Sequence, residues 1–452
     1  MTKKLSFLDC TMLIMGSMIG SGIFIVPAVM SRELGSPLML LVAWVVTAVL
    51  TIFAALSYGE LSAMMPKAGG QYVYLREAYN PLFGFLYGWT LFTVIQTGTI
   101  AAVAVAFAKF SGVFFPFISE KNILMEFGFI KIQTQQILAI VVVWLLTFSN
   151  FRNVKTGAFI QNIFTFTKIG AIVFMILAGI YFAFTQHAQM PDFSVSPGIF
   201  NFNYLGIFSV ALVGSIFSAD AWNNITFTGS EIEKSEKNIP LSLITGTGIV
   251  LTIYFFINWV YLKVLPLDAI QHAESDRVGT LMLQTVFGNA GMYLMALLIM
   301  ISTFGCINGL TLSGARVYYA MANDGLFFSK AKKLNKDHSP QFALVIQAVW
   351  TSILTLSGSY SNLLDYVVFA VLLFYILTVA GVFILRKKQP HANRPYKVFG
   401  YPFLPVLYIL MALIICISLL IFKPDYTYPG LGIVLAGVPV YFFVKRKRGR
   451  GI

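Results

Sequence analysis

Charged residues are scarce in this sequence. They make up 11% of its 452 residues, and 58% of the residues are hydrophobic, whereas ordinary soluble domains carry about 25% charged residues. Polar stretches between the hydrophobic runs are short, the longest lying at about 317–340 and 386–401. There is no room for a soluble domain with a separate activity. The composition predicts an integral membrane protein.

Cysteine and histidine are also sparse. The 3 cysteines, Cys10, Cys306 and Cys416, fall in or beside hydrophobic runs, so no disulfide framework is expected. The 4 histidines fall in or next to loops and suggest neither a metal cluster nor a nucleophile with its base. These absences argue against a membrane enzyme and predict no cofactor. No filter loop or charged ring that would favour a channel is present either.

Hydrophobic runs of about 20 residues, long enough to cross a bilayer as helices, recur along the whole chain. They are continuous and do not alternate as the strands of a membrane barrel do. An all-α membrane protein is therefore expected. Its twelve predicted spans lie at about 8–30, 37–65, 82–116, 134–151, 157–184, 204–231, 240–266, 283–320, 341–358, 362–386, 402–422 and 429–444.

The basic residues are distributed unevenly between the two sides of these spans. Of 31 lysines and arginines, 23 fall at the termini or in the even-numbered connections and 7 fall on the other side. Because basic loops stay in the cytoplasm, both termini are expected there. Lys3 and Lys4 precede the first run, but no signal cleavage site follows, so this run is expected to remain as a span.

Two of the predicted spans contain unusual residues at their centres. The first has three glycines at positions 16, 20 and 22, and the sixth has Asp220 followed by Asn223 and Asn224. Glycines can serve close helix packing, and polar residues can serve interhelical hydrogen bonds. However, these spans begin successive sets of five, and interrupted helices at matching positions are typical of inverted-repeat transporters.

An interrupted helix exposes free N–H groups at its new N-terminus and free carbonyls at the preceding C-terminus. A zwitterionic amino acid offers a carboxylate and an ammonium group to match them. A few hydrogen bonds of about 1.5–3 kcal/mol each would offset much of the cost of desolvating such a ligand. The sequence therefore predicts amino acid transport.

Several motifs, in their order and spacing, resemble the amino acid-polyamine-organocation superfamily, and within it the L-type amino acid transporters and their bacterial relatives. The resemblance covers nearly the whole chain. The motifs are 16–24 (GSMIGSGIF) followed by Pro27, 58–61 (YGEL) leading to 66–74 (PKAGGQYVY), 217–223 (FSADAWN), Glu231 with 238–240 (NIP), 304–309 (FGCING) with Arg316, and 394–398 (RPYKV) with 401–402 (YP).

The resemblance implies ten core helices in two inverted repeats of five, at 8–184 and 204–386, and two peripheral helices at 402–444. It implies that Met18, Ser21 and Gly22 meet the substrate, that Phe217 is a gate, and that Cys306 faces the site. The substrate site implied in this way comprises Ser17, Met18, Gly20, Ser21, Gly22, Phe217, Ser218, Asp220 and Cys306.

Some of these residues also have a simpler structural interpretation. Phe217 is one of 42 phenylalanines and by composition alone would be a packing residue. Cys306 would serve equally as a small packing residue. Asp220 stands where some L-type transporters have a small residue, and this leaves open a preference for cationic substrates.

Lys168 lies about eleven residues into the fifth predicted span, about 16 Å by helical rise. It could serve as a structural partner for helix-end carbonyls. The resemblance implies that it replaces a bound sodium ion as a fixed charge, or carries a coupled proton. Leu310 stands where relatives often have serine, and the nearby hydroxyls belong to Thr311 and Ser313, so the partner of Lys168 stays open.

Together these features predict a sodium-independent transporter of neutral L-amino acids in a bacterial cytoplasmic membrane, working by exchange or proton symport with alternating access. The alternatives are an antiporter of cationic amino acids or polyamines and a transporter-like nutrient receptor. In the L-type group a cysteine in the loop after the third span joins a glycoprotein subunit. The corresponding loop here, at 117–133, has no cysteine, so no disulfide-linked subunit is expected.

Overall fold

The computed structural model describes residues 5–127, 130–151, 154–185, 191, 193, 202–357 and 360–449. Four of the basic residues assigned above to the termini and loops, Lys3, Lys4, Arg152 and Arg450, lie outside the described residues. The described chain is almost entirely helical, and its one sheet is a two-stranded antiparallel hairpin.

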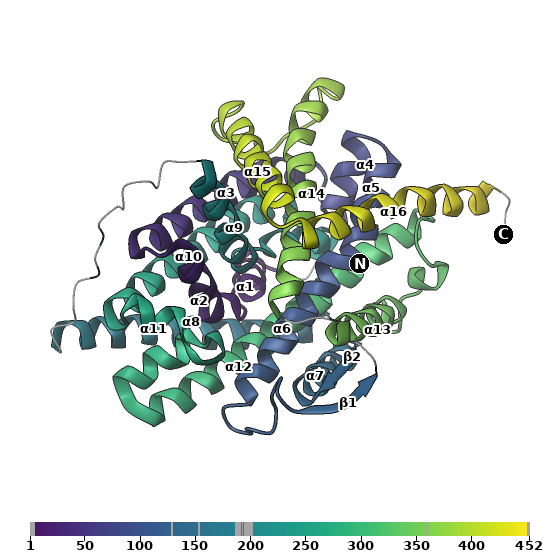
Figure 1. Ribbon diagram of the computed structural model, residues 1–452. Helices are drawn as coiled ribbons and strands as arrows, with labels where there is room; N and C mark the ends of the chain where they lie inside the picture. Colours follow the sequence, from purple (N-terminus) through teal and green to yellow (C-terminus); the bar gives the residue numbers. More distant parts are fainter. Residues whose placement is uncertain are drawn as a thin grey trace.

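The first half of the chain forms the helices up to the fifth predicted span (Figure 1). A short π-helical segment, Leu91–Ile95, joins two of them into one continuous rod. The elements are α1 (Phe7–Met18), α2 (Gly22–Leu34), α3 (Pro37–Met64), α4 (Gln71–Ala78), α5 (Pro81–Thr90), α6 (Gln96–Ser111), β1 (Ile123–Phe127), β2 (Ile130–Gln133), α7 (Thr134–Ser149) and α8 (Val154–Thr185).

The second half begins with another interrupted span and ends with two helices at the edge of the bundle. A 3₁₀ segment, Trp222–Glu231, follows the first helix of this half. The elements are α9 (Phe202–Ser218), α10 (Ser235–Val264), α11 (Leu267–Gln271), α12 (Val278–Asn323), α13 (Gln341–Ser357), α14 (Tyr360–Lys388), α15 (Phe403–Phe422) and α16 (Pro424–Gly449), with short 3₁₀ turns at Glu274–Asp276 and Ser329–Lys332.

The membrane-protein prediction is confirmed. In the described chain, 9 helices are long and apolar enough to span a membrane, and the bent pair α1 and α2 makes up to 10. The shorter apolar helices α7 and α13 occupy the places of the fourth and ninth predicted spans. Each of the twelve predicted runs therefore coincides with a helix or a helix pair. The third run ends early, because α6 stops at Ser111 and turns follow it.

The broken first span lies at the centre of the bundle. Helix α1 contacts α8, α10 and α12, α2 packs along α9, and α3 packs along α10. Figure 1 shows α1 and α2 enclosed by these longer helices, with α15 and α16 outside them. Segments far apart in the sequence are thus brought to the two helix breaks.

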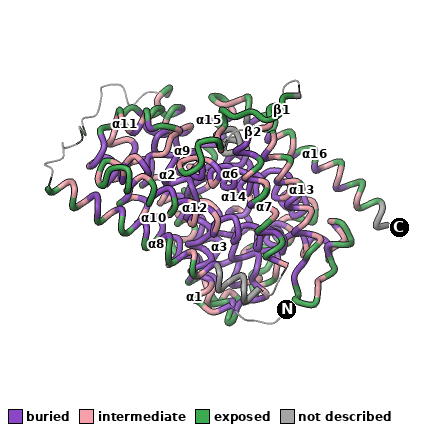
Figure 2. The backbone as a smooth tube through the Cα atoms, turned by 90° about the horizontal axis from the view of Figure 1, so that it is seen from below, coloured by how far each residue is buried: buried purple, intermediate pink, exposed green. Residues whose placement is uncertain are grey.

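The outer helices expose hydrophobic side chains. On α15, Leu410, Ile417 and Ile421 are more than half exposed, although the helix is the most apolar of the chain. Figure 2 shows buried backbone through the centre of the bundle and exposed residues on the peripheral segments. An exposed hydrophobic face of this length suits lipid contact, as in a multi-pass membrane protein.

Candidate functional site

The first helix break lies between Met18 and Gly22. Helix α1 ends at Met18, α2 begins at Gly22, and the two axes are bent by 41°. Glycine is a poor helix former, and Gly20 sits in the interruption, where a Cβ atom would lie 3.2 Å from Cys306 Sγ. The glycines therefore permit both the interruption and a close approach of α12.

Lys168 of α8 reaches this break. Its ammonium Nζ donates hydrogen bonds to the carbonyls of Gly16 at 2.7 Å, Ile19 at 2.8 Å and Ser302 at 3.2 Å. The side chain is 1% exposed. The carbonyls at the end of α1 carry the negative end of the helix dipole, so a buried cation there has both charge complementarity and hydrogen-bond partners.

The open question of a partner on the eighth span is thereby answered. The third carbonyl comes from Ser302, and the Ser302 hydroxyl donates to the Ile19 carbonyl at 3.2 Å. The Ser313 hydroxyl instead donates within its own helix, to the Gly309 carbonyl at 2.9 Å. Ser302 could not be recognised from the sequence, because it lies about two helical turns before Leu310 in α12 and its approach to the first break depends on helix packing.

Two further contacts are made to carbonyls at the end of α1. Tyr254 of α10 donates its hydroxyl to the Met18 carbonyl at 2.9 Å, and the Cys306 thiol lies 3.1 Å from the Ser17 carbonyl. Cys306 therefore faces the first break from α12. Tyr254 was missed, and its only signal in the sequence is a hydroxyl in an apolar span.

The second break follows Ser218 at the end of α9. Ala221 adopts a left-handed conformation with φ 67°, and a 3₁₀ segment continues from Trp222. A left-handed residue cannot continue a right-handed helix. The Asp220 N–H donates to the Phe217 carbonyl at 3.2 Å, so this carbonyl at the end of α9 already has one partner.

The two breaks are in direct contact. A Cβ atom on Gly22 would lie 2.2 Å from Ser218 Oγ and 3.0 Å from Ser218 Cα. Phe217 is 7% exposed and Ser21 is fully buried. Because no side chain fits between Gly22 and Ser218, the start of α2 and the end of α9 close on each other in this conformation.

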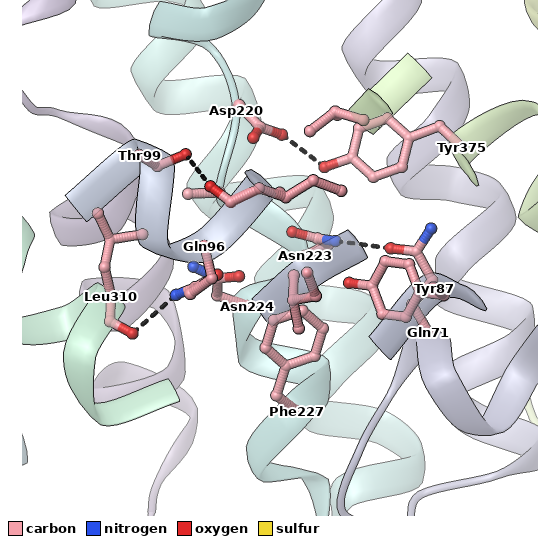
Figure 3. Close-up of a pocket in the computed structure, with 14 residues that line it drawn as sticks. Gln71, Tyr87, Gln96, Thr99, Asp220, Asn223, Asn224, Phe227, Leu310 and Tyr375 are labelled. Atoms are coloured by element: carbon pink, nitrogen blue, oxygen red, sulfur yellow. Dashed lines mark hydrogen bonds between the residues drawn. The ribbon is translucent and has the colours of Figure 1, made fainter. Parts of the chain in front are cut away.

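A small polar cavity lies beside the second break (Figure 3). Gln96 donates to the Leu310 carbonyl at 2.7 Å, Asn223 donates to Gln71 at 3.0 Å, and the Tyr375 hydroxyl donates to Asp220 at 2.5 Å. Figure 3 shows these side chains gathered around the space from separate segments of the chain. Of the expected site residues, only Asp220 lines this cavity.

The cavity is too small for an amino acid in this conformation. The space open to the centre of a water molecule is about 10 Å³, roughly what one water molecule needs. The amide nitrogen of Asn224 has no hydrogen-bond partner among the described residues. A solute as large as an amino acid could enter between the two breaks only if the helices around them moved.

Comparison with known proteins agrees with this architecture. The amino acid permease family profile matches residues 5–440. The serine/threonine exchanger SteT of Bacillus subtilis is 31% identical over 99% of this chain and 98% of its own length. The human large neutral amino acids transporter small subunit 2 is 29% identical over 97% of this chain and 80% of its own.

The human cystine/glutamate transporter is similar to the same extent, with 30% identity over 97% of this chain and 85% of its own length. Each of these matches covers at least 97% of the chain. The chain is thus an amino acid transporter and not an enzyme, and it belongs to the amino acid permease family of the amino acid-polyamine-organocation superfamily.

Proposed function

We propose that the protein is a sodium-independent secondary transporter of neutral L-amino acids that works by alternating access, through exchange or proton symport. The observation that carries this proposal is the ammonium of Lys168 among the carbonyls of Gly16, Ile19 and Ser302. A cation site at the broken helix is already filled by a covalently attached charge, so no sodium ion is needed to hold these carbonyls together.

The substrate would lie along the main chain of the two breaks. In this proposal Ser17, Met18, Gly20, Ser21 and Gly22 bind its carboxylate and amine from the first break. Phe217 with Ser218 and Asp220 completes the site from the second, and Cys306 borders it. The support is that both breaks and Cys306 meet within contact distance.

Among the described residues, Lys168 is the only charged side chain at the first break. Its ammonium already has three acceptors, and this favours a substrate without net charge. The names of two relatives, a serine/threonine exchanger and a large neutral amino acids transporter, point the same way, whereas a third is named a cystine/glutamate transporter. Asp220 on the cavity wall favours a second candidate, a carrier of cationic amino acids or polyamines.

The arrangement of the chain follows from the same proposal. The two broken spans begin two inverted repeats, 8–184 and 204–386, and the helices at 402–444 lie outside them. The excess of basic residues at the termini and even-numbered connections supports a cytoplasmic position for both termini. The loop at 117–133 has no cysteine, and we propose that the chain needs no disulfide-linked subunit.

The test is uptake by the purified chain in proteoliposomes. A panel of neutral, cationic and anionic amino acids and a polyamine would be measured with and without internal amino acid, at two pH values, and with sodium replaced by choline. We expect neutral amino acids to be taken up equally with choline. A requirement for internal amino acid identifies exchange, a proton-gradient requirement identifies symport, and steep sodium dependence refutes the proposal.

A further inference from the structure

A second cavity lies at the end of the bundle where α6 finishes and α12 begins. The space open to the centre of a water molecule is about 150 Å³ there, against about 10 Å³ beside the second helix break, and the two cavities share no lining residue. Its polar lining includes Lys109, Glu120, Lys121, Gln135, Glu274 and Arg277. This space is large enough for a small solute.

Two cations in its wall have no hydrogen-bond partner among the residues that the structure describes. The side chains of Lys109 and Arg277 are 12% and 17% exposed. Their nearest carboxylate oxygens, on Asp276 and Glu274, are 3.9 and 3.8 Å away, which is beyond hydrogen-bond length. Among the described residues, neither side chain donates a hydrogen bond, and a largely buried cation in that state is unfavourable.

The neighbouring acid is already engaged elsewhere. Asp276 accepts a hydrogen bond from Arg32 at 2.8 Å through its other oxygen. Burial lowers the pKa of Arg277 from its ordinary value, as expected of a guanidinium group with too few partners. The inner wall of the cavity therefore has unused capacity to bind an anion.

The carboxylates of the cavity lie at its rim. The Glu274 side chain is 93% exposed, and Glu120 is exposed as well. Lys121 is exposed there as well, so the rim holds two carboxylates and one cation and is net negative. Cations in the inner wall and a net negative rim form a charge pattern that is complementary to a zwitterion entering carboxylate first. A simple anion would find the rim repulsive, whereas an amino acid would place its ammonium group there.

We propose that this cavity is an outer binding site, in which Arg277 and Lys109 bind the carboxylate of the amino acid substrate before it reaches the helix breaks. The inference rests on the proposed function and on the side assigned to this end of the bundle by the charge bias. Such a site concentrates substrate at the entrance. It therefore changes the apparent affinity for external substrate and leaves the maximal rate set by the conformational change.

The kinetic test compares Arg277→Gln with Arg277→Lys and a matched control. L-serine, or the amino acid most strongly transported in the panel, is supplied from outside to right-side-out proteoliposomes. We expect Arg277→Gln to raise KM about tenfold with an unchanged maximal rate, and Arg277→Lys to restore much of the loss. The control is Lys131→Gln, because Lys131 is half exposed on the hairpin and, within the described part of the chain, forms one ion pair, with Glu126.

A labelling test detects occupancy directly. Ser275 lines the cavity and the three natural cysteines are buried, so a Ser275→Cys variant offers one accessible thiol to an impermeant maleimide. We expect the substrate to slow the labelling of this thiol. The same protection should be seen in a Gly22→Leu background, in which the helix breaks are blocked. Arg277→Gln should abolish the protection.

The two tests separate this inference from the proposed function. If the wild-type chain transports no amino acid, the proposed function fails. If it transports normally while Arg277→Gln keeps the wild-type KM, or if Gly22→Leu removes the protection of Ser275→Cys, the outer site is refuted and the proposed function stands. If Arg277→Gln lowers the melting temperature, the outer site is tested instead in the Arg277→Lys background. There the substrate should still protect Ser275→Cys from labelling, and a lack of protection refutes the outer site.

Discussion

Substitution of Lys168 tests directly whether a positive charge is needed at the first helix break. Its three acceptors are main-chain carbonyls of α1, α12 and the interruption between α1 and α2. Replacing it with Ala removes the charged donor from all three carbonyls, although the Ile19 carbonyl keeps the Ser302 hydroxyl as a donor. Each lost hydrogen bond to a charged group is worth about 1.5–3 kcal/mol. We expect Lys168→Ala to abolish uptake and to lower the melting temperature.

Added sodium distinguishes a fixed charge from a proton carrier. If Lys168 only supplies positive charge, a sodium ion can enter the vacated space in Lys168→Ala, so sodium should raise the melting temperature of the variant and leave the wild type unchanged. Arg stays protonated at all relevant pH values. A pH-dependent uptake that disappears in Lys168→Arg, with no sodium effect on Lys168→Ala, would favour proton coupling.

Two glycines on central helices provide a matched pair. A Cβ atom on Gly22 would lie 2.2 Å from Ser218 Oγ, while one on Gly248 of α10 would meet nothing within 4 Å. We expect Gly22→Leu to keep the breaks apart, so that the purified protein inserts and folds but shows no substrate-induced thermal stabilisation. Gly248→Leu should behave as wild type, and normal stabilisation of Gly22→Leu would remove this residue from the site.

At the scale of helices and loops, one buried carboxylate joins three elements. Glu60 of α3 is 2% exposed and accepts hydrogen bonds from Arg386 of α14 at 2.9 and 2.6 Å. It also accepts from the Val398 N–H at 2.8 Å, and Arg394 lies 3.5 Å away. The connection between α14 and α15 is therefore fixed to α3 through a single side chain.

Removing this carboxylate should loosen the C-terminal helices. Loss of one partner of a buried ion pair costs about 3–5 kcal/mol, and the partial exposure of Arg386 (25%) places the effect toward the lower end. We expect Glu60→Ala to lower the melting temperature and increase proteolysis within 389–401. Glu77→Ala is the control, because its partner Arg76 keeps Asp324 as a second acceptor; equal effects of the two changes would contradict this role of Glu60.

At the scale of the whole molecule, the helices could be predicted from the sequence because lipid requires long apolar runs. The two breaks were also predictable, since glycines at 16, 20 and 22 and a buried Asp220 contradict an ordinary span. The contacts between spans could not be predicted in this way. Ser302, Tyr254 and Gln71 reach the site through the packing of helices distant in sequence, and no local pattern marks them. The degree of closure likewise depends on packing alone.

The closed contact between the breaks bears on the proposed gate, Phe217. Its ring is 7% exposed at the end of α9, directly before the Ser218 that meets Gly22. Removing the ring leaves the helix-end N–H groups and carbonyls in place, so substrate recognition should survive. The closed state would lose apolar cover that excludes water, so exchange should slow more than binding weakens.

We therefore expect Phe217→Ala to fold, to bind substrate detectably and to exchange it several-fold more slowly, with all three measured on one preparation. The control is Phe110→Ala in α6, a fully buried ring outside both breaks. Truncation of such a core ring costs about 3–5 kcal/mol, so expression, melting temperature and transport should fall together. If Phe217→Ala behaves like this control, its ring is a packing residue. If it exchanges at the wild-type rate, closure does not depend on Phe217, and the contact between Gly22 and Ser218 becomes the element that seals the site.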